Sequence, residues 1–546
     1  MGTIFLFRRI CFLLLLFLCI HLNPCQVSAQ VQFSSSNLPI IIIDTNGDQI
    51  ESDQRIPAEM KVIAKGRGQR NQVTDSPTDY DGKIMIELRG SATLNYPKKS
   101  YRFETQNDFG GNRNVELCGM PKENDWILYG PYDDQSLIRN VMAYRLSNEI
   151  GAYASRVRMC EVVLNGDYRG VYILTEKIKR DKNRVDVTEM SETDISGDEV
   201  TGGYIIKIDK WSGENVDGWR SSMRVEYQYH YPKADEITSE QKTYIRNYMN
   251  KFEITMSGNN ISNQTTGYPA YIDVDSFVDH FIMNELGKNV DAYRISFFMH
   301  KDRDSKGGKL HAGPIWDFNL SFGKAWYDED LFRVEGWEVD HNDYKPYDSP
   351  KVPFWWENLG HDCAFARKAR SRWISLREGI LSQKSLFRRI DLLVDSLAEA
   401  RFRNFERWPE SEERFYAQEI QMMKNWIVDR LEWIDEDFDE LVSAAEAREA
   451  GRQSDNYYIL QNYPNPFNPF TTIEFKVTQT EHVQLLIYDI TGRKIKTLVN
   501  AVKSPGSYSI VWDGTNNQAQ SVASGLYFCR FEAGSEMCTI KLALVK

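Results

Sequence analysis

Apolar and polar positions follow three successive patterns along the chain. In the first part, apolar runs bounded by turn residues predict strands at 38–43, 83–88, 98–103 and 202–209, and a hairpin over 161–177. Helical spacing then predicts a helix capped near Asp134 or Ser136, helices at 238–252 and 275–286, and a helical region over 354–441. From 471 onward, glycine turns separate short strands at 471–477, 483–490, 508–512, 526–531 and 539–545, which predicts a small β-sandwich. Strands first and helices last indicate an α+β fold for the larger part of the chain.

The two ends and one polar stretch set the domain limits. Residues 1–29 carry Arg8 and Arg9, then an apolar run too short to span a bilayer, then Val-Ser-Ala, which together predict a secretory signal peptide. The polar stretch 443–457 predicts a linker between an α+β domain at 30–442 and the sandwich at 458–546. No later stretch is apolar enough to cross a membrane, so we expect an exported mature chain without a transmembrane segment.

Composition narrows the function classes. The 546 residues are 42% hydrophobic and carry a net charge of −12, which argues against a general nucleic-acid or anionic-membrane binder because such proteins need a basic face. The sequence contains no G-x-S-x-G, H-E-x-x-H or P-loop motif, so neither a common hydrolase nor a P-loop ATPase is indicated. Cys529 and Cys538 lie symmetrically about Ala533-Gly534, so a hairpin there would place them opposite each other, either as a disulfide or as two half-buried thiols.

The candidate chemistry lies in residues 284–323. Two apolar runs around the Gly-containing loop 301–309 predict a β-hairpin, with Asp291 just before the first run and Asp317 at the end of the second. A hairpin returns the chain towards its start, so both carboxylates are expected at one open end. Phosphoryl transfer uses such a pair, because one carboxylate orients the attacking hydroxyl and another holds Mg²⁺. Asp317 and the amide oxygen of Asn319 are suitable hard ligands; the alternative is that Asp291 caps a turn and Asp317 ends a strand.

A second candidate surface is the predicted hairpin over 83–103. Its tip offers Arg89, Ser91 and backbone amides, and its return strand offers Lys98 and Lys99, all of which are groups that cover phosphates. Alternation places the two lysines on opposite faces, so only one of them can point at a ligand. The alternative is an exposed basic hairpin.

Several runs resemble the CotH kinase family of secreted atypical protein kinases. They are NVDAYRISFFMHKD, GPIWDFNLSFG and the R-G-S…P-K-K-S-Y pattern, and the resemblance extends over most of 38–441. It implies a two-lobe atypical protein-kinase-like fold that uses ATP with Mg²⁺, or with Mn²⁺ in its place. It also implies that Asp291 is the catalytic-loop base and Asp317 the metal-binding aspartate.

The same resemblance assigns further site residues. Lys98 or Lys99 takes the place of the phosphate-binding lysine of ordinary kinases, and Glu176 becomes a binding-site residue, with a solvated strand end as the alternative. Arg139 lies on a helix that packs on the nucleotide side in the family, where it contacts either a phosphate or a structural carboxylate. Many relatives carry Asn five residues after the base as a second metal ligand; this chain has Ser296, whose hydroxyl is a poorer Mg²⁺ ligand.

The last domain resembles a different family. The runs LQNYPNPFNP, IYDITGRKIKTLVN, WDG and SGLYF resemble the C-terminal sorting domain of type IX secretion over 459–546. The resemblance implies recognition by the type IX secretion machinery, export through the outer membrane, and a final place at the cell surface or outside the cell.

Two functions follow from these observations. The first is an exported kinase that transfers the γ-phosphoryl group of ATP to Ser or Thr of surface or secreted proteins. The second is a non-catalytic surface adhesion or matrix protein that keeps the kinase-like fold, which Ser296 and the aromatic content allow.

Overall fold

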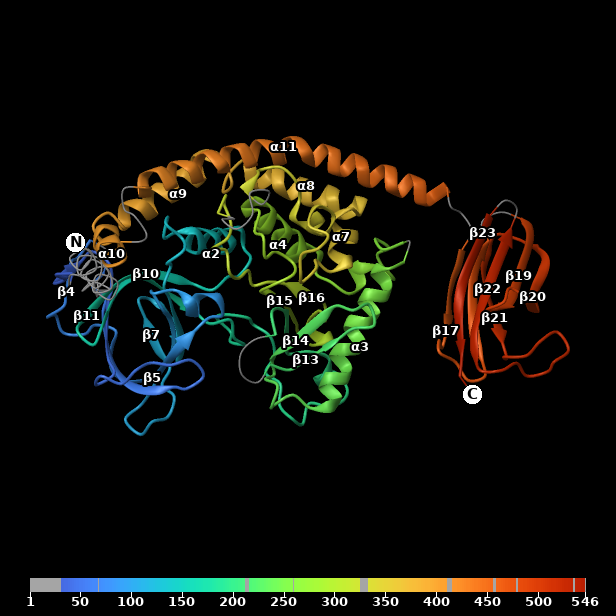
Figure 1. Ribbon diagram of the computed structural model, residues 1–546, viewed down its shortest axis with the longest axis horizontal. Helices are drawn as coiled ribbons and strands as arrows, with labels where there is room; N and C mark the ends of the chain where they lie inside the picture. The colour runs from blue at the N-terminus through green and yellow to red at the C-terminus, as the bar shows by residue number, and fades with distance from the viewer. Residues whose placement is uncertain are drawn as a thin grey trace, which may run out of the picture. The chain divides into compact units, whose positions relative to one another are not determined.

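The computed structural model describes residues 31–545 except 67, 212–215, 259, 325–331, 410–414, 455–457, 478–479 and 534–535. The predicted signal peptide therefore lies outside the described residues, as does the end of the predicted linker. Contacts divide the chain into two units, Met1–Leu441 and Val442–Lys546 (Figure 1). No helix in the described ranges is both long enough and apolar enough to cross a membrane.

The first unit begins with a closed barrel of strands in the order β10-β11-β9-β6-β5-β3-β2, which the parallel pairing of β2 with β10 completes. The strands are β2 (Ile40–Asp44), β3 (Ile56–Ile63), β5 (Tyr80–Arg89), β6 (Ser100–Thr105), β9 (Asp125–Tyr129), β10 (Val157–Leu164) and β11 (Asp167–Glu176). Two small ribbons accompany it, β1 (Ser35–Ser36) with β4 (Asn71–Gln72) and β7 (Val115–Leu117) with β8 (Met120–Glu123). The predicted hairpin over 161–177 is confirmed, because β10 and β11 turn at Asn165-Gly166, both with positive φ.

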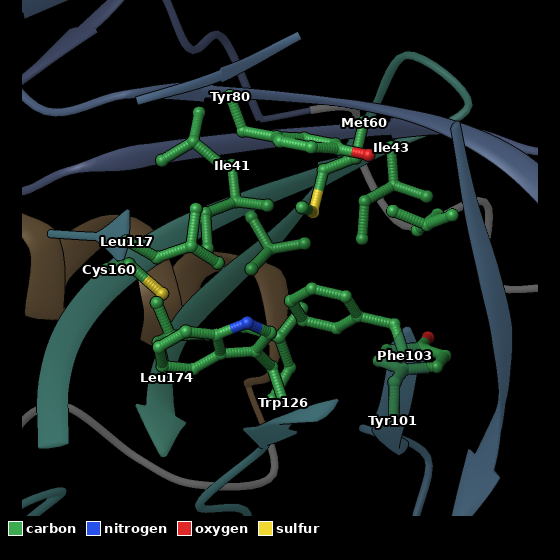
Figure 2. Close-up of a cluster of buried hydrophobic side chains, with 14 of the residues drawn as sticks. Ile41, Ile43, Met60, Tyr80, Tyr101, Phe103, Leu117, Trp126, Cys160 and Leu174 are labelled. Atoms are coloured by element: carbon green, nitrogen blue, oxygen red, sulfur yellow. The ribbon is translucent and has the colours of Figure 1, made fainter. Parts of the chain in front are cut away.

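Strand alternation separates the apolar interior of the barrel from its outer face. Phe103 of β6 and Trp126 of β9 are register partners, and both side chains are buried in the interior (Figure 2). At the alternate positions the side chains point outward, and there Glu87 of β5 pairs with Arg102 of β6. The outer face of β5 and β6 therefore carries charge, and it continues to Arg89 at the end of β5.

A second sheet and most of the helices complete the first unit. The sheet has the order β13-β14-β12-β15-β16, formed by β12 (Tyr204–Ile208), β13 (Gly218–Arg220), β14 (Glu226–Tyr231), β15 (Phe297–Lys301) and β16 (Leu310–Ala312). The helices include α2 (Arg139–Ile150), α3 (Ser239–Met256), α4 (Val274–Gly287), α6 (His341–Tyr344), α7 (Phe354–Gly360), α8 (Cys363–Arg377), α9 (Gln383–Ser396), α10 (Ala400–Arg407) and α11 (Tyr416–Ser454). Short 3-10 turns include η1 (Ala92–Asn95), η4 (Asp304–Lys306) and η5 (Glu338–Asp340).

Aromatic packing fixes α4 against the second sheet. The ring of Trp356, on α7, lies 5.3 Å from that of Phe277 on α4 and 5.6 Å from that of Phe297 on β15. Trp356 is fully buried. Because large aromatic rings dominate the energetics of a core, this cluster fixes the first turn of α4 against the second sheet. The helix ends at Gly287, and the chain continues into the turn at 288–296.

The predicted helices at 238–252 and 275–286 are confirmed by α3 and α4. Thr238 caps α3 in a capping box with Gln241, as the sequence pattern favours. The last helix does not end at Leu441 but continues to Ser454, because the residues after Leu441 are mainly Ala, Glu and Arg, which are strong helix formers. The strand predicted at 98–103 begins only at Ser100, so both lysines of that segment precede it.

The hairpin predicted in the candidate region is also confirmed. β15 pairs antiparallel with β16, with Met299 opposite Ala312. The second extended run is shorter than predicted, since the strand ends at Ala312 and the segment that contains Asp317 follows as irregular chain.

The second unit is a two-sheet β-sandwich. One sheet has the order β17-β18-β21 and the other β20-β19-β22-β23. Their strands are β17 (Tyr458–Tyr463), β18 (Thr471–Val477), β19 (Glu481–Asp489), β20 (Lys494–Lys503), β21 (Gly506–Trp512), β22 (Gly525–Ala533) and β23 (Glu536–Leu544). Phe475, Trp512 and Phe531 are buried between the sheets. All predicted strands are present, whereas β17 and β20 were not predicted; β20 stays half-exposed along its length and therefore lacks a clear apolar alternation.

The predicted position of Cys529 opposite Cys538 is wrong. In the β22–β23 pair, Cys529 faces Ile540, two positions from Cys538. Ala533 pairs with Glu536, so the turn lies one residue later than the sequence symmetry indicated. Both cysteines are free thiols.

Candidate functional site

Asp291 lies in the turn between α4 and β15. Its backbone N–H donates to the Oδ1 of Asn289 at 3.4 Å, and its side chain is 14% exposed. The guanidinium of Arg294 lies beside it, with Nη2 at 3.9 Å from the Asp291 Oδ1. The turn thus presents a carboxylate that is mostly enclosed by protein and still reached by solvent.

Asp317 is held from the other side by α2. Its backbone N–H donates to the hydroxyl oxygen of Tyr144 at 3.0 Å, and the N–H of Phe318 donates to the Oδ1 of Asn140 at 2.7 Å. Asp317 has φ of 61°, the left-handed conformation that a non-glycine residue adopts only when its surroundings enforce it. Its side chain is partly accessible to solvent.

Electrostatics place the two carboxyls in one neighbourhood. Burial raises the pKa of Asp317 to about 7, and the charge of Asp291 adds to the rise while that of Arg89 opposes it. Burial also raises the pKa of Asp291, against the opposing charge of Arg294. The charge of Asp291 therefore reaches Asp317, although the two residues lie on different segments of the chain.

A third carboxylate, Asp209, joins them and was missed by the sequence analysis. It follows β12, and its Oδ1 accepts the backbone N–H of Ser296 at 3.4 Å and that of Lys210 at 2.9 Å. Its charge raises the pKa of both Asp291 and Asp317. The pairing of β12 with β15 brings it there, and a pattern of apolar residues gives no information on which strands pair.

Arg89 is a cation near Asp317, whereas Arg294 pairs with Asp291 and Lys207 pairs with Asp209 at 2.8 Å. Its Cζ lies 5.4 Å from the centre of the Trp316 ring, which in turn stacks on Tyr144 at 5.7 Å. Burial lowers the pKa of Arg89, and the charge of Asp317 is the leading influence that raises it again. Arg89 thus faces the carboxylates from the end of β5.

Asn319 points its amide nitrogen at a different carboxylate, with Nδ2 donating to the Oδ2 of Asp133 at 3.3 Å. Burial raises the pKa of Asp133, as does the neighbouring Asp134. This bond uses the amide N–H of Asn319, so the amide oxygen is the atom that a metal would engage.

Strained backbone is concentrated in this region. Of the twelve non-glycine residues with positive φ in the described chain, five lie between 288 and 322, namely Lys288, Tyr293, Ser296, Asp317 and Phe322. Such residues cluster at functional sites, where the fold holds them in unfavourable conformations. Ser296 uses its backbone N–H to bind Asp209.

The residues at the tip of the β5–β6 hairpin differ from the prediction. Lys98 is buried, with Nζ donating to the carbonyl oxygen of Val171 at 2.6 Å and to the Oδ1 of Asn404 at 2.7 Å. Burial lowers the pKa of Lys98 to about 7. Both its polar contacts are internal, so Lys98 anchors α10 to the barrel and is not a phosphate ligand. The observed strand β6 begins at Ser100, so neither lysine lies on it.

The other two residues at the hairpin tip, Ser91 and Lys99, lie beside the η1 turn. Lys99 Nζ donates to the carbonyl oxygen of Leu94, 2.6 Å away, and so closes the η1 turn. Ser91 is exposed just before that turn. Neither side chain contacts Asp209, Asp291 or Asp317. Arg89 is therefore the hairpin residue that faces these carboxylates.

Arg139 pairs with structural carboxylates, which is the second of the two roles expected for it. Its Nη1 lies 2.6 Å from the Oδ1 of Asp134 and 2.8 Å from the Oε1 of Glu419, and its Nε donates to the Ser321 carbonyl oxygen at 2.8 Å. A recess adjoins this ion pair and is also lined by Lys324. Asp291, Asp317 and Asp209 do not line it, so it is separate from the carboxylate group.

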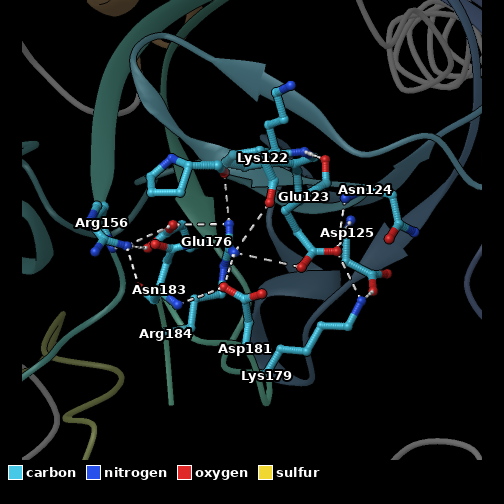
Figure 3. A network of polar contacts seen from close by, with 12 residues as sticks. Lys122, Glu123, Asn124, Asp125, Arg156, Glu176, Lys179, Asp181, Asn183 and Arg184 are labelled. Atoms are coloured by element: carbon cyan, nitrogen blue, oxygen red, sulfur yellow. Dashed lines mark hydrogen bonds and ion pairs between the residues drawn. The ribbon is translucent and has the colours of Figure 1, made fainter. Parts of the chain in front are cut away.

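Glu176 is neither a solvated strand end nor open to a ligand. It is fully buried in an ion-pair network, with its carboxylate 3.0 Å from Nη1 of Arg156 and 3.0 Å from Nη2 of Arg184 (Figure 3). Lys179 extends the network by bridging Glu123 at 2.9 Å and Asp125 at 2.7 Å. The binding role expected for Glu176 is therefore corrected to a structural one.

The cluster of Asp209, Asp291 and Asp317 does not form a complete metal-binding site by itself. Within the described ranges, no three His, Cys, Asp or Glu side chains are arranged to hold a metal ion by themselves. Mg²⁺ does not need such a site, because it is usually bound by one or two carboxylates together with phosphate oxygens and water. The charge balance also fits a cation: Asp317 feels the carboxylates of Asp291, Asp133 and Asp209, and Arg89 opposes them.

Fold and site together define a mixed α/β domain with a group of carboxylates beside a partly exposed arginine, followed by an immunoglobulin-like sandwich. The chain belongs to the CotH kinase family: the family model described as CotH kinase protein matches residues 86–434. A model described as FlgD Ig-like domain matches residues 470–536. Among curated proteins, the inner spore coat protein H of Bacillus subtilis (strain 168) is 22% identical over 326 residues, which cover 56% of this chain and 76% of that protein.

Solved structures add no argument about the fold. The dimeric latent PorU of Porphyromonas gingivalis is 21% identical over 16% of this chain and 9% of its own, with a TM-score of 0.14. The Pseudomonas fluorescens alkylpurine DNA glycosylase AlkC, bound to DNA with an abasic site analogue, is 13% identical over 54% of this chain and 96% of its own, with a TM-score of 0.13.

Proposed function

We propose that the chain is an ATP-dependent protein kinase that phosphorylates Ser or Thr hydroxyls, with Asp291 and Asp317 as its two acidic site residues. One observation carries the proposal: the two carboxyls share a solvent-reachable neighbourhood with Arg89, and all three lie in the range matched by the CotH family model. Perturbed carboxyls next to a cation are typical of catalytic sites.

The reaction requires a base, a cation site and charge stabilisation. Asp291 orients the acceptor hydroxyl and takes its proton, while the hydroxyl oxygen bonds to the γ-phosphorus and the bond to the β-phosphate oxygen breaks to release ADP. Asp317 and Asn319 are the residues that would hold Mg²⁺ or Mn²⁺. A metal held there would supply positive charge that offsets the negative charge of the nucleotide phosphates. Arg89 stabilises the charge of the transferred group.

The raised pKa of Asp291 supports its role as the base. A carboxylate with an ordinary pKa is a weak base at neutral pH, and efficiency increases as the pKa approaches the working pH. Burial moves the pKa of Asp291 in that direction, and Asp209 adds to the shift.

A transfer assay tests the proposal. The purified chain is incubated with γ-³²P-labelled ATP, Mg²⁺ and dephosphorylated casein, and label on casein is measured. Asp291→Asn and Asp317→Asn are each expected to lower the rate by about 100-fold or more, since general-base and electrostatic contributions are each of this size. The matched control is Asp435→Asn, which removes a carboxylate paired with Arg377 away from the site and is expected to keep the rate. Absence of transfer by the wild type, or full activity of Asp317→Asn, would contradict the proposal.

The second candidate is a non-catalytic surface or matrix protein with the same fold. Ser296, at the position where many relatives carry Asn, favours it, because Ser296 turns its backbone and not an amide side chain towards Asp209. Calorimetry with ATP and Mg²⁺ separates the two. Heat of binding that disappears in Asp317→Asn supports the kinase, and the absence of any binding by the wild type supports the matrix protein.

We also propose that the protein acts outside the cytoplasm. Supporting this are the predicted signal peptide at 1–29, the relative named as an inner spore coat protein, and the resemblance of 459–546 to type IX sorting domains. Its substrates are then surface or secreted proteins, and the type IX machinery is a transient partner. Protein recovered from culture medium should begin at Gln30 by N-terminal sequencing, and intact protein retained in the cytoplasm would contradict the proposal.

A further inference from the structure

Arg294 is more firmly held than an ordinary surface cation. Its side chain is 4% exposed, and its Nε donates to the carbonyl oxygen of Val290 at 2.9 Å. Its Nη1 donates to the carbonyl oxygen of Pro350 at 3.2 Å and lies 3.0 Å from the Oδ2 of Asp348. These three acceptors fix the guanidinium, and its other nitrogen, Nη2, faces Asp291.

Asp348 is in turn held from behind by a buried pair. The Nε2 of His341 lies 3.0 Å from the Oδ2 of Asp348, and its Nδ1 lies 3.4 Å from the Oε2 of Glu338. Tyr344 donates its hydroxyl to the Oε1 of Glu338 at 2.8 Å. His341 and Glu338 are each 1% exposed, so this end of the row is shielded from water.

The row therefore runs from η5 and α6 to the turn after α4: Glu338, His341, Asp348, Arg294, Asp291. Burial by itself raises the pKa of Asp348, but the hydrogen bond from His341 and the charge of Arg294 hold it below its ordinary value. A structural ion pair would be complete with Arg294 and Asp348 alone. The continuation to Asp291 matters because Arg294 is the ion-pair partner that the Asp291 carboxylate has among the described residues.

We propose that Arg294, braced by Asp348 and His341, is a positioning residue that fixes the Asp291 carboxylate for the acceptor hydroxyl. The inference rests on the proposed function for its catalytic consequence, but not for the arrangement itself. It assigns a task to the segment 338–350, which lies outside the predicted motifs. A guanidinium suits this task because its planar fork contacts two carboxylates at once, which an ammonium cannot do with the same geometry.

Kinetics give the first test, with the full chain, ATP, Mg²⁺ and dephosphorylated casein. Arg294→Gln is expected to lower kcat by about 10–100-fold with the KM for ATP changed less than about twofold, as for other outer residues that orient a reacting group. Arg294→Lys should recover part of kcat because the charge remains, and Asp348→Asn should lower kcat by about 3–10-fold. The matched control is Asp279→Asn, which breaks a 2.8 Å ion pair to Arg372 between α4 and α8, and it should leave kcat unchanged.

Carboxyl labelling gives the second test and does not depend on activity. Carbodiimide with glycine ethyl ester labels reachable carboxyls, and mass spectrometry reports the extent at Asp291. Arg294→Gln should increase labelling of Asp291 several-fold, while Asp279→Asn should not. Unchanged labelling of Asp291 in Arg294→Gln overturns the inference, as does an equal loss of kcat in Asp279→Asn. If the wild type transfers no phosphate while labelling changes as expected, the proposed function fails and the positioning by Arg294 stands.

Discussion

Replacing Asp317 by Asn is expected to stabilise the metal-free protein at neutral and alkaline pH. Burial, with the added charge of Asp291, raises the pKa of Asp317 to about 7 from an ordinary value of 3.8. Between these pH values the unfolded chain releases the proton while the folded chain retains it, so this group makes stability fall as pH rises. Above pH 7 the folded protein carries the full cost of an ionised, enclosed carboxyl.

The size of the effect follows from the shift. A rise of about three pKa units corresponds to about 4 kcal/mol at 1.36 kcal/mol per unit. The side chain retains some solvent contact, so we reduce the expected gain for Asp317→Asn to about 2–3 kcal/mol at pH 8. At pH 4 the aspartate is largely protonated in the folded state and half protonated in the unfolded one, so the expected change is below about 0.5 kcal/mol.

Urea unfolding followed by tryptophan fluorescence at pH 4, 6 and 8, with EDTA present, measures this difference. The control is Asp302→Asn in the same unit: hydrogen bonds from Thr188 and Arg303 overcome the effect of burial and lower the pKa of Asp302, so its replacement should reduce stability at pH 8. The reasoning is refuted if Asp317→Asn leaves stability at pH 8 unchanged or lowers it, or if it adds the same amount at pH 4 and pH 8.

Four further outcomes follow from the same structure. Trp126→Ala, in the barrel interior, should lower the free energy of unfolding by about 3–5 kcal/mol, measured by urea titration. Glu176→Gln removes the charge of the buried carboxylate between Arg156 and Arg184, but Asp181 and Glu123 stay beside Arg184, so it should cost about 1–3 kcal/mol in the same assay, with the KM for ATP unchanged. Asn404→Ala removes an acceptor of the buried Lys98 and should cost about 1–3 kcal/mol. Arg89→Gln should raise the KM for ATP about tenfold in the casein assay, since it removes a charge-assisted phosphate contact. A smaller loss for Trp126→Ala than for Asn404→Ala, or an unchanged KM in Arg89→Gln, would count against the structure.

The elements that could be predicted are those defined by nearby residues. The hairpin between Asp291 and Asp317 could be predicted because its two strands and its loop are contiguous in the sequence. The helix start at Thr238 could be predicted because a capping box is a local pattern. The same holds for the strands of the sandwich, apart from β17 and β20. Local patterning therefore gave most of the elements and the leading pair of carboxylates.

What could not be predicted depends on contacts between distant segments. Lys98 looked like a phosphate ligand because nothing near it indicated that Asn404, from a helix much later in the chain, would bind its ammonium. Glu176 was expected to bind a ligand, with a solvated strand end as the alternative, because its arginine partners approach from other segments. Asp209 reaches the site only through the pairing of β12 with β15. In each case the tertiary partner, and not the residue type, decides whether a charged group is structural or available.

The most direct test of the account is a crystal of the protein soaked with Mg²⁺ and a non-hydrolysable ATP analogue. The account predicts an ion at about 2.0–2.1 Å from a carboxylate oxygen of Asp317, with the γ-phosphate between Asp291 and Arg89. An analogue bound elsewhere, for example in the recess beside Arg139 and Lys324, with no ion at Asp317, would contradict it.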